Sequence, residues 1–186
     1  MHPERQRFSG VVEVDETYVG GRDDGKRRPA HRDNKKLVVI IAVQLLEPKG
    51  FGRMRLRSIA DATKSSIEPF ICDSIEPGSV VQTDGSPAYD SIQQYGYTRN
   101  KIVQPGADDP AHVTLAGVHC IASLLKRWLM GTHQGSVKAQ QLDYYLDEYT
   151  FRFNRRTSRS RSLLFFRLLE QAVMTAPVTY QEITRA

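Results

Sequence analysis

The chain has 186 residues, enough for one domain with a substantial core, and its net charge of +5 favours a polyanionic partner. Its two cysteines, Cys72 and Cys120, form no C-x-x-C pair, which argues against a disulfide framework or a zinc ribbon and fits the reduced cytoplasm. No apolar run approaches the roughly 18 residues that span a bilayer, so we expect no membrane partner.

The segment from 10 to 21 has the sequence GVVEVDETYVGG, in which β-branched and aromatic residues alternate with polar ones. This alternation, closed by a glycine pair, predicts a β-strand. Asp15 lies inside it, although aspartate is depleted in strands and is seldom buried without a partner. Taken alone, the segment is equally typical of an amphipathic edge strand with a hydrated acidic face.

The residues from 20 to 36 are rich in glycine and charge and predict a basic hairpin tip, which is either a solvated loop or an arm that contacts phosphates. We assign four of its residues to DNA binding: Arg22, Lys26, Arg27 and Arg28. The apolar run 37–46 predicts a strand buried on both faces. Residues 53–59 alternate basic and apolar side chains and predict a third strand, so the three strands form an antiparallel meander.

Residues 66–75 have apolar side chains at helical spacing and predict a helix. The next strand is expected at 79–85, where SVVQTDG places Asp84 at the strand end before a turn-forming glycine. A short helix at 88–94, a strand at 101–104 and a loop at 105–110 follow.

Asp15 and Asp84 are two carboxylates on separate strands, an arrangement that suits a magnesium site for phosphoryl chemistry. Mg²⁺ prefers carboxylate oxygens and takes only one or two protein carboxylates per ion. Two ions roughly 3.5–4 Å apart can stabilise the attacking and leaving oxygens of an in-line displacement. We therefore predict that Asp15 and Asp84 hold two Mg²⁺ or Mn²⁺ ions.

The apolar period becomes helical from residue 113 onward, with one stripe along 118–129 and another along 142–153. We expect Gly131 to close or bend the first of these helices, and a last helix at 163–173. The aromatic residues Trp128 and Tyr145 lie on the stripes and are assigned to the core. A second basic cluster, assigned to DNA binding, contains Arg152, Arg155 and Arg156.

The element order β-β-β-α-β-α-β-α, with further helices appended, predicts an α/β fold of the ribonuclease-H-like kind. Such a fold has a mixed sheet, made of a three-strand antiparallel meander plus parallel strands, flanked by helices. The strands of Asp15 and Asp84 would be neighbours at its centre. We expect one catalytic domain from 8 to 174 and a C-terminal tail from 175 to 186.

Four motifs match a known family: VEVDETYVGG at 12–21, QTDGSPAY at 82–89, LLKRWLMGTHQG at 124–135 and FRFNRR at 151–156. Through them the chain resembles the catalytic region of DDE-type transposases of insertion sequences, of the ISXO2-like type, in the retroviral-integrase and ribonuclease-H-like superfamily. The resemblance implies metal-dependent DNA strand cleavage and strand transfer at insertion-sequence ends. It also implies DNA as partner, a homo-oligomer on DNA, and a place in the bacterial cytoplasm at the nucleoid.

The resemblance further implies a triad of acidic catalytic metal ligands, of which the first two are Asp15 and Asp84. The family often has a lysine seven residues after the third acid, about two helical turns away and on the same face. Counting back from Lys126 gives His119, a departure from that pattern. Either His119 is the third ligand, through an imidazole that suits Mn²⁺ or Zn²⁺ better than Mg²⁺, or it is a helix-start histidine without a catalytic role. Lys126 either contacts DNA phosphate or is a solvated helix lysine.

Transposases of this kind usually carry a zinc-ribbon or helix-turn-helix segment ahead of the catalytic region. The chain begins a few residues before its first strand and lacks paired cysteine ligands, so we expect the N-terminal DNA-binding segment to be absent. Two alternatives stay open beside an active transposase domain. One is a structure-directed nuclease with the same fold and metals, and the other is an inactive remnant that binds DNA only through its charge.

Overall fold

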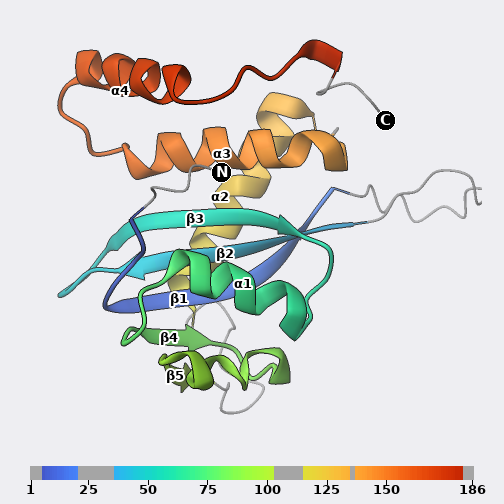
Figure 1. Ribbon diagram of the computed structural model, residues 1–186, viewed down its shortest axis with the longest axis vertical. Helices are drawn as coiled ribbons and strands as arrows, with labels where there is room; N and C mark the ends of the chain where they lie inside the picture. The colour runs from blue at the N-terminus through green and yellow to red at the C-terminus, as the bar shows by residue number, and fades with distance from the viewer. Residues whose placement is uncertain (1–5, 21–35, 103–114, 135–136, 182–186) are drawn as a thin grey trace, which may run out of the picture.

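The computed structural model describes residues 6–20, 36–102, 115–134 and 137–181 (Figure 1). The basic hairpin tip predicted from the sequence, with Arg22, Lys26, Arg27 and Arg28, lies outside the described residues, as does the loop expected at 105–110.

A five-stranded mixed sheet forms the centre of the molecule, in the order β3-β2-β1-β4-β5. The strands are β1 (Val11–Val19), β2 (Leu37–Leu45), β3 (Phe51–Ile59), β4 (Val80–Thr83) and β5 (Thr98–Lys101). The first three form an antiparallel meander, while β4 runs parallel to β1 and β5 parallel to β4. The predicted ribonuclease-H-like arrangement is confirmed, including the adjacency of the two strands that lead to Asp15 and Asp84.

Helices cover both faces of this sheet, with α1 in front of it and α2 behind it in Figure 1. The helices are α1 (Lys64–Ser74), α2 (Ala116–His133), α3 (Ala139–Asn154) and α4 (Arg161–Val173). On the face opposite α1, α2 packs on β1 and β2, and α3 packs on β3. Helix α4 lies beyond α3 as seen from the sheet (Figure 1).

The strand β2 is buried on both faces, as its continuous apolar sequence predicts. Val39, Ile41 and Val43 belong to the core that the sheet forms with α2 and α3. Ile40 and Ala42 belong to the second core, formed with α1 and the turns after β4. Because side chains alternate along a strand, β1 likewise contributes Val12 and Val14 to the α1 face and turns Glu13 and Asp15 toward the α2 face.

Three local predictions are wrong. The last strand lies at 98–101 instead of 101–104, because its sequence TRNK is mostly exposed and has no apolar alternation to mark it. The short helix is a pair of 3₁₀ turns, Pro87–Tyr89 and Ile92–Tyr95. Gly131 lies inside α2, which ends two residues later at His133, with Gln134 in the left-handed conformation.

The assignment of the helix aromatics to the core is confirmed. Trp128 and Tyr145 are partly buried and pack against the core shared by α2 and α3. Trp128 also contacts Tyr149, with ring centroids 5.3 Å apart, and the His133 ring stacks on Tyr145 at 3.9 Å.

Candidate active site

Asp15 lies on β1, and Asp84 directly follows the neighbouring parallel strand β4. The register of β1 and β4 pairs Glu13 with Gln82, and two residues further along each chain come Asp15 and Asp84. Adjacent strands lie about 4.8 Å apart, so the two aspartates start from neighbouring points of the sheet. The repulsion between their charges contributes to the raised pKa of Asp15.

The pKa of Asp15 is raised to about 7, mainly because burial disfavours the charged carboxylate. The neighbouring carboxylates of Glu16, Asp84 and Glu13 raise it further, while the Glu16 N–H, which donates to Asp15 Oδ1 at 2.8 Å, lowers it. Negative charge is therefore concentrated at the centre of the sheet in a partly desolvated setting. A bound cation would relieve this repulsion.

Glu16 adds a third carboxylate, on the opposite face of β1 from Asp15. The hydroxyl of the buried Tyr89 donates to Glu16 Oε2 at 2.5 Å. Burial raises the pKa of Glu16, and the bond from Tyr89 lowers it. Burial and the Glu16 charge also raise the pKa of Tyr89, so this hydroxyl keeps its proton and remains a donor. Sequence reasoning did not assign Glu16 a role, although it stands beside Asp15.

A compact turn holds Asp84 at the end of β4. Its Oδ1 accepts the N–H of Ser86 at 2.9 Å, the hydrogen bond of an Asx turn. Ser86 Oγ in turn accepts the N–H of Ala88 at 3.3 Å and caps the 3₁₀ turn that begins at Pro87. The sequence DGSP thus fixes one oxygen of Asp84 locally.

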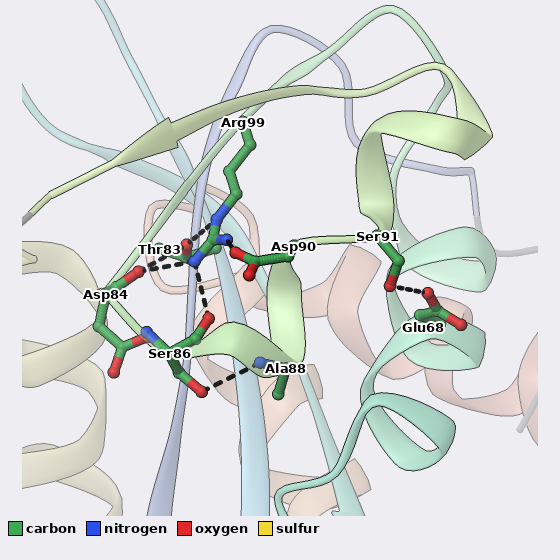
Figure 2. A network of polar contacts seen from close by, with 8 residues as sticks. All are labelled: Glu68, Thr83, Asp84, Ser86, Ala88, Asp90, Ser91 and Arg99. Carbon is green, nitrogen blue, oxygen red and sulfur yellow. Dashed lines mark hydrogen bonds and ion pairs between the residues drawn. The ribbon is translucent and has the colours of Figure 1, made fainter.

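Arg99, on β5, clamps the same turn from the side (Figure 2). Its Nη2 donates to the carbonyl oxygens of Asp84 and Ser86, both at 2.9 Å, and its Nε donates to Thr83 Oγ1 at 2.9 Å. Its Nη1 forms an ion pair with Asp90. The Arg99 side chain is only 5% exposed, so its donors bind the turn that holds Asp84 and do not face the solvent.

Glu13 is a buried carboxylate on β1 that meets the first turn of α2. The residue is 4% exposed, and its Oε2 accepts the N–H of Val118 at 2.9 Å. Burial raises the pKa of Glu13, whereas hydrogen bonds from the backbone of Val118 and Gly117 lower it. Sequence reasoning missed both Glu13 and Arg99.

His119 follows Val118 directly and is partly buried, and Lys126 lies exposed two turns later. The opposite flank of α2 faces α3, because Tyr149 of α3 packs on Trp128. Successive helix residues are rotated by about 100°, so His119 and Lys126 lie on the flank turned away from α3. Since α3 covers β3, that flank faces the side of the sheet where β4 carries Asp84.

The donor chemistry of the aspartate pair suits Mg²⁺ or Mn²⁺, since both prefer carboxylate oxygens. In the described ranges, no group of three or more His, Cys, Asp and Glu side chains is arranged so that it could hold a metal ion. The structure thus brings Asp15 and Asp84 together and does not add His119 to them as a ready third ligand.

The second basic cluster lies at the opposite edge of the sheet, where α3 ends against β3. Arg156 donates to the carbonyl oxygens of Gly52 and Phe153, at 3.2 and 3.0 Å. Arg152 pairs with Glu148 at 2.7 Å, and Arg155 lies over the Phe151 ring at 4.0 Å from its centroid. The structure therefore does not bring these arginines to the aspartate pair.

Comparison with known proteins identifies the family. The model of the ISXO2-like transposase domain matches residues 7–154, which is most of the chain. The chain belongs to this family. The transposase domain is also 29% identical over 161 residues to an uncharacterised protein in the transposable element ISH50 of Halobacterium salinarum. That match covers 80% of the chain and 53% of the relative, so the chain spans about half of the relative's length.

A solved structure supports the fold of this transposase domain. The simian T-cell lymphotropic virus intasome, solved in complex with the PP2A regulatory subunit B56 gamma, has a chain that matches with a TM-score of 0.52. The match covers 86% of the transposase domain and 54% of that chain, at 13% identity. None of the described helices has both the length and the hydropathy needed to cross a membrane.

Proposed function

We propose that this chain is the catalytic domain of a DDE-type transposase that cleaves DNA strands at insertion-sequence ends and joins them to target DNA. The observation that carries the proposal is the placement of Asp15 on β1 and of Asp84 directly after the adjacent parallel strand β4, in a chain of the transposase family. Its place of action would be the bacterial cytoplasm at the nucleoid, because that is where its DNA substrate lies.

In this proposal Asp15 and Asp84 are the carboxylate ligands of two Mg²⁺ or Mn²⁺ ions, and His119 is the third ligand. The donor set and the charge repulsion at Asp15 support it. Bound there, the ions would activate the attacking oxygen and stabilise the leaving oxygen of an in-line displacement. Arg99 and the turn at 84–86 would keep the Asp84 carboxylate in place without touching the substrate.

The basic residues would hold DNA phosphates without reading sequence. Lys126 is exposed on the same helix flank as His119, and so would contact phosphate near the scissile bond. Four residues of the segment between β1 and β2 would also contact phosphates: Arg22, Lys26, Arg27 and Arg28. Arg152, Arg155 and Arg156 would contact DNA at the far edge of the sheet.

A nicking assay with matched aspartate variants tests this proposal. The chain should nick DNA that carries insertion-sequence ends when Mn²⁺ or Mg²⁺ is present, and Asp15→Asn and Asp84→Asn should each abolish nicking. Asp143→Asn is the control, because this exposed α3 aspartate accepts the Ser58 N–H through Oδ1, an oxygen that asparagine retains. Nicking that survives in both Asp15→Asn and Asp84→Asn would refute the assignment.

The DNA substrates that are cut and the products that form distinguish a transposase from a structure-directed nuclease and from an inactive remnant. Joining of pre-cleaved ends to target DNA identifies a transposase, whereas nicking of branched or flapped DNA without joining identifies a structure-directed nuclease. An inactive remnant would bind DNA and show no metal-dependent nicking at all.

The role of His119 is tested by replacing its imidazole with a carboxylate or with a methyl group. Imidazole brings no negative charge, so His119→Glu should increase Mg²⁺-supported nicking, because hard Mg²⁺ prefers carboxylates. His119→Ala should weaken nicking with either metal. An alanine variant as active as the parent chain with both Mg²⁺ and Mn²⁺ would show that His119 is not a ligand.

A further inference from the structure

We propose that Glu13 is a positioning residue for this site: its carboxylate fixes the first turn of α2, and with it His119, to the strand that carries Asp15. The inference rests on the proposed function, because Glu13 can position a ligand only if His119 acts beside Asp15 and Asp84.

The contact joins two segments that are far apart in the sequence. Val118, whose N–H donates to Glu13 Oε2 at 2.9 Å, lies 105 residues after Glu13. Glu13 and Asp15 are two residues apart on one strand and so project from the same face of the sheet. His119 is the next residue after Val118 in the helix. One hydrogen-bonded carboxylate therefore links the position of Asp15 to that of His119.

The start of α2 depends on this outside carboxylate. The residue at its N-cap is Leu115, which has no polar side chain, and in the described part of the chain the helix start has no side-chain cap of its own. The first turn of any helix leaves N–H groups without partners inside the helix, and a carboxylate is a favoured acceptor for them. Glu13 performs the role of an N-cap residue from a neighbouring strand.

Gly117 allows the helix to approach this closely. A Cβ atom at this position would lie 2.8 Å from Glu13 Oε2 and 2.9 Å from Val43 Cγ1, both closer than such contacts permit. Any larger residue would therefore push the first turn of α2 away from β1. Gly117→Ala consequently disturbs the same contact as Glu13→Ala, from the opposite side and without removing a charge.

Fixing a helix start could make Glu13 a purely stabilising residue, so the test requires a carboxylate that holds another helix start and has no link to the site. Asp61 is such a carboxylate: its Oδ1 accepts the N–H of Thr63, the residue before α1, at 3.2 Å and the hydroxyl of Ser66, in the first turn, at 2.7 Å. Asp61→Ala removes a carboxylate from a helix start on the other face of the sheet. It is the matched control for stability.

The experiment titrates the full chain with Mn²⁺ and follows the NMR signals of the His119 imidazole, which a nearby paramagnetic ion broadens. Nicking is measured in parallel as a function of Mn²⁺ concentration. The variants are Glu13→Gln, Glu13→Ala, Gly117→Ala, the Glu13→Ala/Gly117→Ala double variant and Asp61→Ala. Hydrogen exchange along the rest of α2 verifies that each variant is folded.

We expect Glu13→Ala and Gly117→Ala each to raise the Mn²⁺ concentration required for broadening and for nicking by about 10–100-fold, the usual effect of losing a residue that orients a ligand. Glu13→Gln should retain most of the response, since its amide oxygen still accepts the backbone N–H groups. The loss in the double variant should be smaller than the sum of the two single losses, because both changes disturb the contact between Glu13 and the first turn of α2. Asp61→Ala should respond like the parent chain.

The inference is overturned if folded Glu13→Ala and Gly117→Ala respond to Mn²⁺ like the parent chain, or if Asp61→Ala loses the response equally. In those outcomes the parent chain still binds Mn²⁺, and the proposed function stands. If the parent chain itself shows neither broadening nor metal-dependent nicking, the proposed metal site is wrong and the positioning role is overturned with it.

Discussion

At the scale of single residues, Asp15 is held in a setting that opposes its charge. Burial is the largest cause of its raised pKa, and the charges of Glu16, Asp84 and Glu13 add to it. Such a cluster lowers the stability of the metal-free fold above the pKa of Asp15. Strongly perturbed carboxylates of this kind are characteristic of functional sites.

The stability of the metal-free protein should therefore fall with rising pH, and Asp15→Asn should reduce this fall. The Asp15 pKa is about 7 in the folded state and 3.8 in the unfolded reference, so between these values the folded state holds a proton that the unfolded state has lost. The stabilisation is complete below pH 3.8 and is lost as pH rises through 7. Above pH 7 in EDTA, the variant should be more stable than the parent chain by about 1–3 kcal/mol.

Chemical denaturation from pH 4 to 8 in EDTA measures this effect. Asp143→Asn, whose carboxylate lies on the exposed surface of α3, is the control and should follow the parent curve. An Asp15→Asn variant with the same pH dependence as the parent chain would contradict the raised pKa.

We predict that Arg99 holds the Asp84 turn through the geometry of its guanidinium group as well as through its charge. A lysine keeps the charge but cannot reproduce the planar set of donors that joins Asp84, Ser86 and Thr83. We expect Arg99→Lys to destabilise the fold by about 1–3 kcal/mol and to reduce nicking further than this loss explains. The control is Arg57→Lys, which alters another strand arginine paired with an exposed aspartate, Asp73 at 2.9 Å. Equal nicking by the two folded variants would show that Arg99 does not position Asp84.

At the scale of elements, the sequence is informative wherever burial leaves a periodic pattern. The meander and α1 to α4 follow from apolar alternation and helical stripes. The edge strand β5 has no such pattern, because its side chains are mostly exposed. It pairs with β4 through backbone hydrogen bonds, which leave no periodic pattern in the sequence. Gly131 was expected to close or bend α2; it does not close the helix, which continues through the glycine to His133.

The candidate site also contains residues that the sequence reveals and residues that it does not. The nearness of Asp15 and Asp84 could be predicted, because each stands at an unusual place in a strand pattern and the fold makes the two strands neighbours. Glu13 and Arg99 could not, because their roles exist only in contacts with residues distant in sequence, such as Val118 and Asp84. In the sequence, Glu13 and Arg99 look like ordinary polar residues of a strand.

The glycines of α2 give a prediction about the element itself. Gly131 is exposed, has a helical conformation, and would place a new Cβ in open space. Gly131→Ala should therefore stabilise the protein by about 0.5–1 kcal/mol, because glycine loses more conformational freedom than alanine in a helix. Thermal unfolding tests this, with the crowded Gly117→Ala as the opposite case. A Gly131→Ala variant that lowers the melting temperature would contradict the open environment.

At the scale of the whole molecule, the proposed function predicts a long DNA contact, because the net charge is +5 and the basic groups of α3 lie apart from the aspartate pair. Arg152 and Arg155 lie where α3 ends beside β3, two strands away from β1. If both contact phosphates, Arg152→Gln/Arg155→Gln should weaken binding to specific and scrambled DNA alike. Each lost contact should flatten the slope of log affinity against log salt by about 0.9. Lys49→Gln, at the β2–β3 turn, is the control; an unchanged slope in the double variant would exclude this edge from the DNA path.

Helix α4 leaves much of its apolar surface uncovered in the single chain. Seven of its side chains and C-terminal neighbours are 44–80% exposed: Leu163, Phe165, Phe166, Leu168, Leu169, Val173 and Met174. Together these side chains offer on the order of 800 Å² of exposed surface, spread around the helix, and an interface on one side of α4 would bury part of it. A second copy of this chain is the partner that fits the expected homo-oligomer, because a two-fold contact pairs the same patch on both copies.

We therefore predict that the chain forms a concentration-dependent dimer through α4, and that Phe165→Glu/Leu168→Glu makes it monomeric. The two residues are three apart on one helix face, so charges there would be buried against their own copies in the dimer. Because both side chains are exposed in the single chain, the double variant should fold and melt like the parent chain at low concentration. Sedimentation equilibrium over the micromolar range measures the change, and Tyr180→Glu, at an apolar position 80% exposed outside α4, is the control. A parent chain that stays monomeric throughout that range, with and without DNA, would contradict the assignment of α4 as the oligomer surface.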